Sequence, residues 1–421
     1  MTKSDSSTTT RHLTPTSYKF RLADFLVGAQ MLCVAFGALV LVPILTGLDP
    51  NVALFTSGLG TLCFQLVTGG KIPVYLASSF AFIAPITLSV EKYGLAATLS
   101  GLAAAGVVYL ILSIIIFWRG SELIARVLPP VVTGPVIMVI GLSLAPIAVE
   151  MASQAGEGYS GAIAILVATV SFLTTVVSAI LVRGFLRLLP ILFGIITGYI
   201  IALPLGLVDF TPIGAAPWLQ IPSFVAPSFS LPAILLILPV AIAPAIEHIG
   251  DVLAISSVTN NDYLRDPGIH RTLLGDGLAT TIAAFLGGPP NTTYSEVTGA
   301  VALTRAFNPA IMTWAAIIAI ALSFFGKLGA ILQTIPVPVM GGILIVLFGT
   351  IVIVGMQTTL VSANALLLPR NLAIASSILI LGVGGISINI GAFALEGIGL
   401  SSIIGVLLNL LLPKGKQSTV L

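Results

Sequence analysis

The chain has 421 residues, of which 57% are hydrophobic and 8% are charged, and its formal net charge is +2. Soluble domains carry about 25% charged residues, so this composition excludes an ordinary soluble globular protein. The near-neutral charge gives no basis for nucleic-acid binding, and the 2 cysteines form neither a disulfide framework nor a zinc-ligand pattern. The motifs of metalloproteases, serine hydrolases and phosphate-binding loops are also absent from the sequence, so it indicates no enzyme.

Apolar runs recur from end to end, and each is long enough to cross a hydrocarbon core about 30 Å thick. The unbroken runs exclude a membrane β-barrel, which shows alternating segments of about 10 residues. The sequence therefore predicts an all-α polytopic membrane protein with fourteen transmembrane segments, at 24–46, 51–69, 74–89, 95–117, 128–148, 160–182, 188–206, 231–256, 272–287, 292–304, 308–326, 332–355, 371–387 and 395–413.

The charges outside these spans predict the orientation. Residues 1–23 are polar and lack the apolar core of a cleaved signal peptide, so we expect a short disordered cytoplasmic lead. With that end inside, every Lys and Arg except Lys92 and Lys327 falls on the inner side, as the positive-inside rule requires. We therefore expect the protein in the cytoplasmic membrane with both termini, including the tail 414–421, in the cytoplasm.

The two halves of the chain resemble each other. LPPVVTGPVIMVIG, from residue 128, is similar to IPVPVMGGILIVLFG, which begins 207 residues later, and the interrupted stretches 72–80 and 289–297 lie 217 residues apart. Seven spans per half is an odd number, so the second half must run inverted, which gives a 7+7 inverted repeat. Such repeats with paired broken helices are typical of secondary transporters, whose substrate site lies near the bilayer midplane. Chance similarity between Gly- and Pro-rich apolar strings is the alternative.

The interrupted stretches in spans 3 and 10 are rich in β-formers, and helical runs follow them near Ser79 and Ser295. Extended backbone at membrane depth persists only where protein or a cavity satisfies it. We therefore expect two short strands that pair as a ribbon, followed by half-helices whose free N–H groups point at a cavity.

Three acidic residues, Glu247, Asp251 and Glu296, lie in segments predicted to be in the membrane. A carboxylate at that depth costs at least about 2.5 kcal/mol and indicates a functional site. Carboxylates disfavour anions and suit protons, metal cations or neutral molecules with N–H donors. This argues against a sulfate or bicarbonate transporter of the same architecture, which remains the distant alternative. For Glu296 the alternative is a plain capping carboxylate, and His248, on another face of its helix, is interpreted as helix packing.

Three strings carry a family resemblance: SSFAFIAP (78–85), AIEHIGD (245–251) and NTTYSEVTGAVALTR (291–305). They resemble the nucleobase–ascorbate transporters, also called nucleobase cation symporter-2, and within them the bacterial uracil permeases. The resemblance implies a core domain of residues 24–118 and 228–328, and a gate domain of residues 119–227 and 329–413. It also implies transport by movement of core against gate, in a homodimer.

Residue by residue, the resemblance assigns substrate binding to Glu247, Glu296, Phe80, Ala38, Tyr294 and Ser295. A uracil-like ring offers N–H donors beside C=O acceptors, which an ionised or protonated carboxyl group can match. We expect proton symport through Glu247, Asp251 and Glu296, with no metal and no cofactor besides the coupling proton.

The chain departs from the family pattern at several positions. Asp251 stands where the uracil branch usually has His, and Asp276 resembles the purine branch. Val297 replaces the Asn of the family signature, and Met31 stands where His is common. Glu296 favours uracil, because the purine branch generally has Gln there. The expected substrate is therefore uracil, with xanthine or urate as the alternative; sodium in place of the proton stays open.

Overall fold

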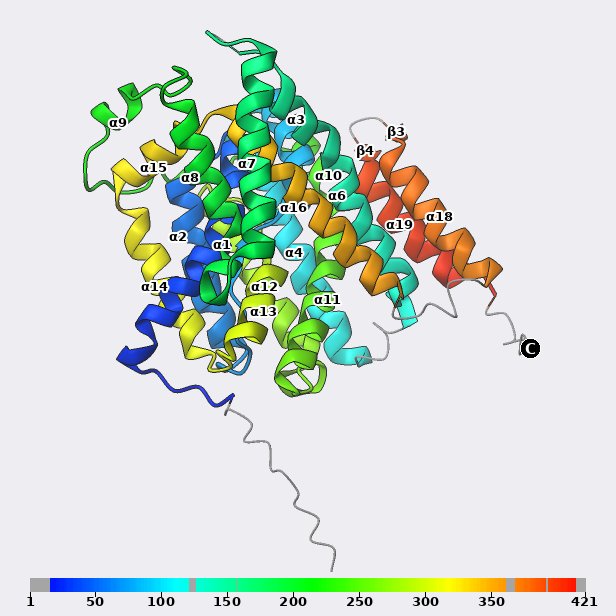
Figure 1. Cartoon of the computed structure of the whole chain (residues 1–421). Coiled ribbons are helices and arrows are strands. Elements are labelled where there is room, and N and C mark those ends of the chain that lie inside the picture. Colours follow the sequence, from blue (N-terminus) through cyan, green and yellow to red (C-terminus); the bar gives the residue numbers. More distant parts are fainter. Residues whose placement is uncertain (1–15, 121–125, 157, 361–367, 391–392, 414–421) are drawn as a thin grey trace, which may run out of the picture.

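The computed structural model describes residues 16–120, 126–156, 158–360, 368–390 and 393–413. Most of the expected N-terminal lead and the tail 414–421 lie outside these ranges. The described chain is mostly helical (Figure 1). Seven of its helices are long and apolar enough to cross a membrane, and four more are apolar but shorter, with 10–17 residues. The prediction of a polytopic helical membrane protein is therefore confirmed.

The helices follow the predicted spans closely along most of the chain. Those of the first half are η1 (Leu22–Asp24), α1 (Phe25–Thr46), α2 (Pro50–Val67), η2 (Phe80–Phe82), α3 (Ile83–Tyr93), α4 (Leu95–Arg119), α6 (Pro130–Ser153), α7 (Gly161–Leu181), η3 (Gly184–Leu188), α8 (Pro190–Ala202) and α9 (Thr211–Ala215). Those of the second half are α10 (Leu231–Ile237), η4 (Leu238–Ala241), α11 (Ile242–Thr259), η5 (Leu264–Gly268), α12 (Ile269–Phe285), α13 (Ser295–Thr304), α14 (Ala310–Ser323), α15 (Gly326–Gln333), α16 (Val337–Leu360), α18 (Pro369–Val383) and α19 (Gly397–Leu411).

The helices pack in two groups. In one, α12 packs against α2 and α4, and α14 packs against α1 and α2. In the other, α16 packs against α6 and α7, and α18 packs against α6 and α19. In Figure 1, α2 and α14 lie at the left and α18 and α19 at the right. Glycines bring helices together: a Cβ at Gly134 of α6 would lie 2.6 Å from the Gly355 carbonyl oxygen of α16. Small residues at such crossings are typical of membrane helices.

A short ribbon joins the two halves of the chain inside the first group. Strand β1 (Leu76–Ser78) pairs antiparallel with β2 (Asn291–Thr293), and Leu76 is opposite Thr293. These are the two stretches for which the sequence predicts extended backbone. The Thr61 hydroxyl of α2 accepts from the Leu76 N–H at 2.9 Å, and the Thr280 hydroxyl of α12 donates to the Asn291 carbonyl at 2.9 Å. The helices on either side thus satisfy backbone groups that lipid would leave unpaired.

The eighth predicted span, 231–256, is one helical span whose α-helical pattern is broken in the middle. It divides into α10, the 3-10 turn η4 and α11, with Pro239 inside the turn and Pro244 in the first turn of α11. Proline lacks the backbone N–H that would bond to the preceding turn, which explains the break. A second hairpin, β3 (Ser387–Ile390) with β4 (Phe393–Glu396), precedes α19, so the last span begins at Gly397 and not at 395.

The segment before α1 is ordered from residue 16 onward, so the prediction of a disordered lead is wrong for residues 16–23. Phe20 stacks on Trp314 of α14, with ring centroids 4.6 Å apart. The Trp314 indole N–H donates to the Arg21 carbonyl at 2.8 Å. The Asn308 side chain donates to the Lys19 carbonyl at 2.7 Å and accepts from the Lys19 N–H at 3.0 Å. Polarity alone did not reveal that two aromatic side chains and one asparagine would hold this segment.

Candidate functional site

The three acids predicted from the sequence meet between α11 and α13. Glu247 and Asp251 lie one turn apart on α11, and Glu296 lies in the first turn of α13, which packs against α11. The carboxyl groups are close enough to interact electrostatically. Glu247 and Glu296 are half-buried, whereas Asp251 is only 4% exposed. The arrangement thus combines two half-buried glutamates with one enclosed aspartate.

Asp251 is held by the residues that follow the ribbon. The Thr293 hydroxyl, at the end of β2, donates to Asp251 Oδ2 at 2.6 Å, and the Ser295 hydroxyl, at the start of α13, donates to Oδ1. Ser295, expected to line the substrate pocket, therefore uses its only hydroxyl proton on Asp251. Both oxygens of the carboxyl group are satisfied, and α11 is fastened to the start of the half-helix that carries Glu296.

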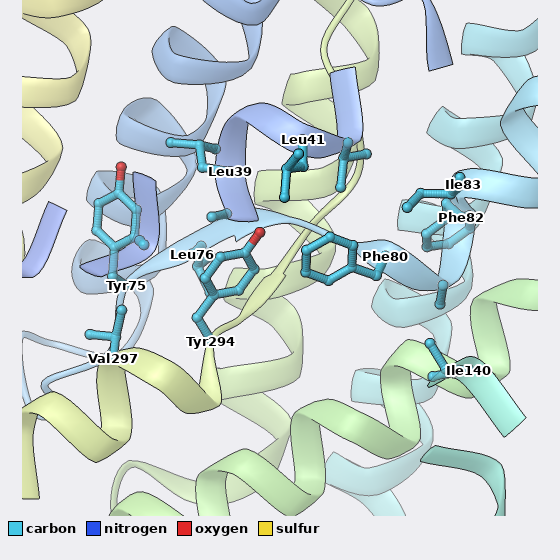
Figure 2. Packing of buried hydrophobic residues seen from close by; sticks show 14 of the residues in the cluster. Leu39, Leu41, Tyr75, Leu76, Phe80, Phe82, Ile83, Ile140, Tyr294 and Val297 are labelled. Atoms are coloured by element: carbon cyan, nitrogen blue, oxygen red, sulfur yellow. The ribbon is translucent and has the colours of Figure 1, made fainter. Parts of the chain in front are cut away.

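Aromatic side chains lie beside the ribbon. Phe80, at the start of η2, stacks with Tyr294 at a centroid distance of 6.3 Å and an interplanar angle of 14°. Figure 2 shows these two rings side by side where the strands end, with Leu41 of α1 nearby. The Tyr294 hydroxyl donates to the Ser78 carbonyl at 2.7 Å, which fixes the ring. Phe80 also meets Phe348 of α16 edge to face at 6.0 Å, so it contacts both helical groups.

The start of α13 lacks a side-chain cap, and Tyr294 occupies the N-cap position. The first-turn N–H groups and the helix dipole favour negative charge there, which suits Glu296 in the first turn. One turn further on, Gly299 is exposed, and a Cβ built on it would meet nothing within 4 Å. This face of α13 therefore borders open space.

A second polar pair lies deeper, between α11 and α12. His248 and Asp276 are both fully buried, and His248 Nδ1 lies 3.2 Å from Asp276 Oδ2. His248 Nε2 lies 2.9 Å from the Thr272 hydroxyl, which donates its proton to the Ile269 carbonyl at 3.0 Å. Because its own proton is used, the hydroxyl is available to His248 Nε2 as an acceptor. His248 is thus part of a polar connection between helices that its interpretation as plain helix packing missed.

The remaining predicted positions differ in what they contribute. Ala38 lies in α1, but its side chain is outside the part of the chain that the structure describes. Val297 is 1% exposed and Met31 is fully buried, so both pack in the apolar core. Sequence reasoning did not single out Thr293 as a partner of Asp251. The available signal was its place at the end of a predicted strand, followed by a polar half-helix start.

The chain matches a permease family and has permeases as its curated relatives, so it is a multi-pass membrane transporter and not an enzyme. Among the described residues, no cluster of three or more His, Cys, Asp or Glu side chains could hold a metal ion. Residues 22–390 match the model of a permease family. The chain therefore belongs to the nucleobase–ascorbate transporter family, as the three sequence strings indicate.

Curated relatives are similar over nearly their whole length. The probable uracil permease of Haemophilus influenzae is 54% identical over 397 residues, which cover 94% of this chain and 96% of the relative. The uracil permease of Bacillus caldolyticus is 46% identical over 396 residues, 92% of each chain. The uracil permease of Escherichia coli K12 is 40% identical over 384 residues, covering 91% of this chain and 89% of the relative.

Solved structures with the same fold are more distant in sequence. The transmembrane domain of the cyanobacterium bicarbonate transporter BicA aligns with a TM-score of 0.61 at 16% identity, covering 94% of this chain and 99% of that domain. The structure of SLC26A9 aligns with a TM-score of 0.70 at 12% identity, covering 94% of this chain and 66% of that one. At these identities the similarity concerns the fold alone.

Proposed function

We propose that this protein imports uracil across the bacterial cytoplasmic membrane together with protons. The observation that carries the proposal is the half-buried pair Glu247 and Glu296, with Phe80 stacked on Tyr294 at the start of the helix that carries Glu296. The names of the relatives, which are uracil permeases at 40–54% identity, support the substrate. The three carboxyl groups, two of them on half-buried residues, disfavour an anionic cargo.

Glu247 and Glu296 bind the edge of the base. An ionised carboxyl group accepts from a ring N–H, and a protonated one also donates to a ring C=O. The face of the base lies against Phe80, whose ring is fixed between Tyr294 and Phe348. Ala38 and Ser295 complete the lining in this proposal. The open N-terminus of α13 supplies further N–H donors for a carbonyl oxygen.

Proton coupling follows from the position of Asp251 between the substrate-binding acids and the ribbon. Its two oxygens accept from Thr293 and Ser295, so a proton on either oxygen weakens the hydrogen bond that this oxygen accepts. A weaker bond loosens α11 from the start of α13 and thereby alters the spacing of Glu247 and Glu296. Proton binding at Asp251 and base binding at Glu247 and Glu296 are then linked through the backbone at the start of α13. All three acids are proposed to take part.

The moving parts are the core domain, residues 24–118 and 228–328, and the gate domain, residues 119–227 and 329–413. The packing of α12 with α2 and α4, and of α16 with α6 and α7, supports this division. Phe80, which touches Phe348, lies where the two domains meet. We also propose that the protein works as a homodimer.

The fourteen-span inverted repeat is likewise part of this proposal. Thr61 on α2 and Thr280 on α12 support it, because each hydroxyl brackets the N–H and the C=O of one ribbon residue, Leu76 and Asn291 respectively. The basic residues favour cytoplasmic termini. In Figure 1 the first described residues and the last turn of α19 lie toward the same end of the molecule, opposite α9.

The test is uptake of radiolabelled uracil into proteoliposomes under an imposed pH gradient, acidic outside, with unlabelled xanthine, urate and thymine as competitors. We expect uptake to follow the gradient and to fall strongly in Glu247→Gln and Glu296→Gln. The matched control is Glu150→Gln, an exposed glutamate at the end of α6. Uptake that ignores the gradient would contradict proton coupling, and competition by xanthine but not thymine would replace uracil by a purine.

A further inference from the structure

A basic cavity lies between the N-terminal segment and the loop that joins α13 to α14. Its volume is about 190 Å³, and the residues that line it include Lys19, Arg21, Asp24, Arg305 and Asn308. It is remote in sequence from Glu247, and it has no part in the transport mechanism proposed above. Basic cavities at the cytoplasmic ends of membrane helices are typical sites for phosphate-bearing headgroups.

The charge in this cavity is unbalanced. Three cationic side chains line it, and among the described residues none of the three forms an ion pair with a carboxylate. The single acid, Asp24, accepts at Oδ2 from the Asn308 side chain at 2.9 Å. Lys19, Arg21 and Arg305 are exposed, and such an excess of positive charge at a membrane surface attracts an anion. Arginine forks match phosphate oxygens in a bidentate manner.

The backbone around the cavity is fixed before any ligand arrives. Asn308 forms two hydrogen bonds with the backbone of Lys19, at 2.7 and 3.0 Å, and so holds the segment against the loop. Arg305 ends α13 with φ +56°, a left-handed conformation that is uncommon for a residue other than glycine. That turn brings Arg305 to the same cavity as Lys19 and Arg21.

The surface beside the cavity is apolar and exposed. Leu22 is 78%, Leu26 70% and Phe20 51% exposed, within the segment that supplies Lys19 and Arg21. Trp314 donates its indole N–H to the Arg21 carbonyl, and tryptophan is enriched where a membrane protein meets the headgroup region. Basic side chains next to exposed leucines fit a molecule with a phosphate head and acyl chains better than they fit a free ion.

We propose that this cavity binds a phosphate group, presented by an anionic phospholipid such as phosphatidylglycerol in the surrounding leaflet. Lys19, Arg21 and Arg305 bind the phosphate oxygens, and the acyl chains lie along Leu22 and Leu26. A lipid held there fastens the N-terminal segment to the loop that follows α13.

The test compares the wild type with Lys19→Gln/Arg21→Gln/Arg305→Gln. Each protein is placed in phosphatidylcholine nanodiscs with a rising fraction of phosphatidylglycerol, and retained lipids are counted by native mass spectrometry after extraction. At about 1 kcal/mol for each basic residue near a charged membrane surface, the triple variant should bind phosphatidylglycerol roughly 100-fold more weakly. The matched control is Arg119→Gln/Arg126→Gln/Arg183→Gln, which removes the same charge elsewhere and should behave as the wild type.

Two further measurements separate the role of charge from folding and the lipid from free phosphate. The variant Arg21→Lys/Arg305→Lys keeps the charge of the cavity and should retain most of the lipid binding. It tests the role of the charge even if the triple variant does not fold. Inorganic phosphate is added to detergent-solubilised wild type, and it should not raise the melting temperature at millimolar concentration. Equal lipid retention in the triple variant and the wild type would overturn the proposal. A stabilisation by inorganic phosphate that matches that of phosphatidylglycerol would overturn the lipid as the source.

Discussion

The Thr293 hydroxyl donates to Asp251 Oδ2 at 2.6 Å, which links strand β2 to α11 across 42 positions of the sequence. Both carboxyl oxygens of Asp251 are engaged in this structure, because the Ser295 hydroxyl donates to the other one. The ribbon, the half-helix α13 and the acid-bearing helix α11 therefore form one connected unit, and the site depends on that connection.

Replacing Thr293 by Val should remove the hydrogen bond that links β2 to Asp251 of α11. The loss of a hydrogen bond to an ionised group costs about 1.5–3 kcal/mol, so uracil uptake should fall by roughly tenfold or more. The measurement is the initial rate of uptake as a function of external pH. Thr293→Ser keeps the hydroxyl and should keep most of the rate. Equal rates in Thr293→Val and wild type would show that the contact is not needed for transport.

Glu296→Gln should weaken uracil binding and shift the preference of the site toward purines. The amide cannot match the base edge as an ionised carboxylate does, and the loss corresponds to about 1.5–3 kcal/mol, roughly 10- to 150-fold in Kd. Isothermal titration of the detergent-solubilised protein with uracil and with xanthine measures both effects. Glu150→Gln is the control. If the Kd for uracil is unchanged in Glu296→Gln, Glu296 does not bind the base.

Phe80→Ala removes the ring that lies between Tyr294 and Phe348. Because Phe80 is 8% exposed, its truncation should cost about 3–5 kcal/mol in stability, with a lower melting temperature as well as weaker uracil binding. Phe285→Ala, at a position that is 58% exposed, should leave both unchanged. Differential scanning fluorimetry and titration with uracil are the measurements. A normal Kd in Phe80→Ala would limit this ring to a structural role.

The pair His248 and Asp276 should behave as a unit. Removing one partner of a buried pair costs about 3–5 kcal/mol because it leaves the other unpaired, whereas removing both costs less. We expect His248→Leu and Asp276→Leu each to lower the melting temperature more than the double variant does. A double-mutant cycle of unfolding in detergent checks this. Additive losses would mean that the 3.2 Å approach of the two side chains contributes nothing to stability.

Much of the fold and part of the site could be predicted from the sequence, and the physical reasons are specific. Long apolar runs identified helices such as α4 and α7, and proline with β-formers identified the stretches that become β1 and β2. The acids of α11 and α13 were recognised because charge is expensive at membrane depth. Contacts between residues far apart in the sequence could not be predicted, because the polarity of a residue does not identify the residue that it contacts.

Three features show this limit. Pairing of His248 with Asp276 depends on the relative rotation of α11 and α12, which no local pattern specifies. The hairpin at 387–396 replaces what was expected to be a loop and the start of the last span. The N-terminal segment is ordered by Trp314, Thr313 and Asn308, all on α14 or the loop before it. In each case the structure depends on contacts between residues that the composition of the segment does not specify.

The ribbon also has a consequence for how the protein is made. Leu76 is synthesised long before Thr293, its partner, and a growing chain emerges from the ribosome in order. Throughout that interval β1 sits in the newly inserted first half with one edge unpaired, supported on its other side by Thr61 of α2. Completion of the candidate site therefore waits until β2 and α13 have been synthesised, and a chain that stops before β2 lacks Thr293, Ser295 and Glu296.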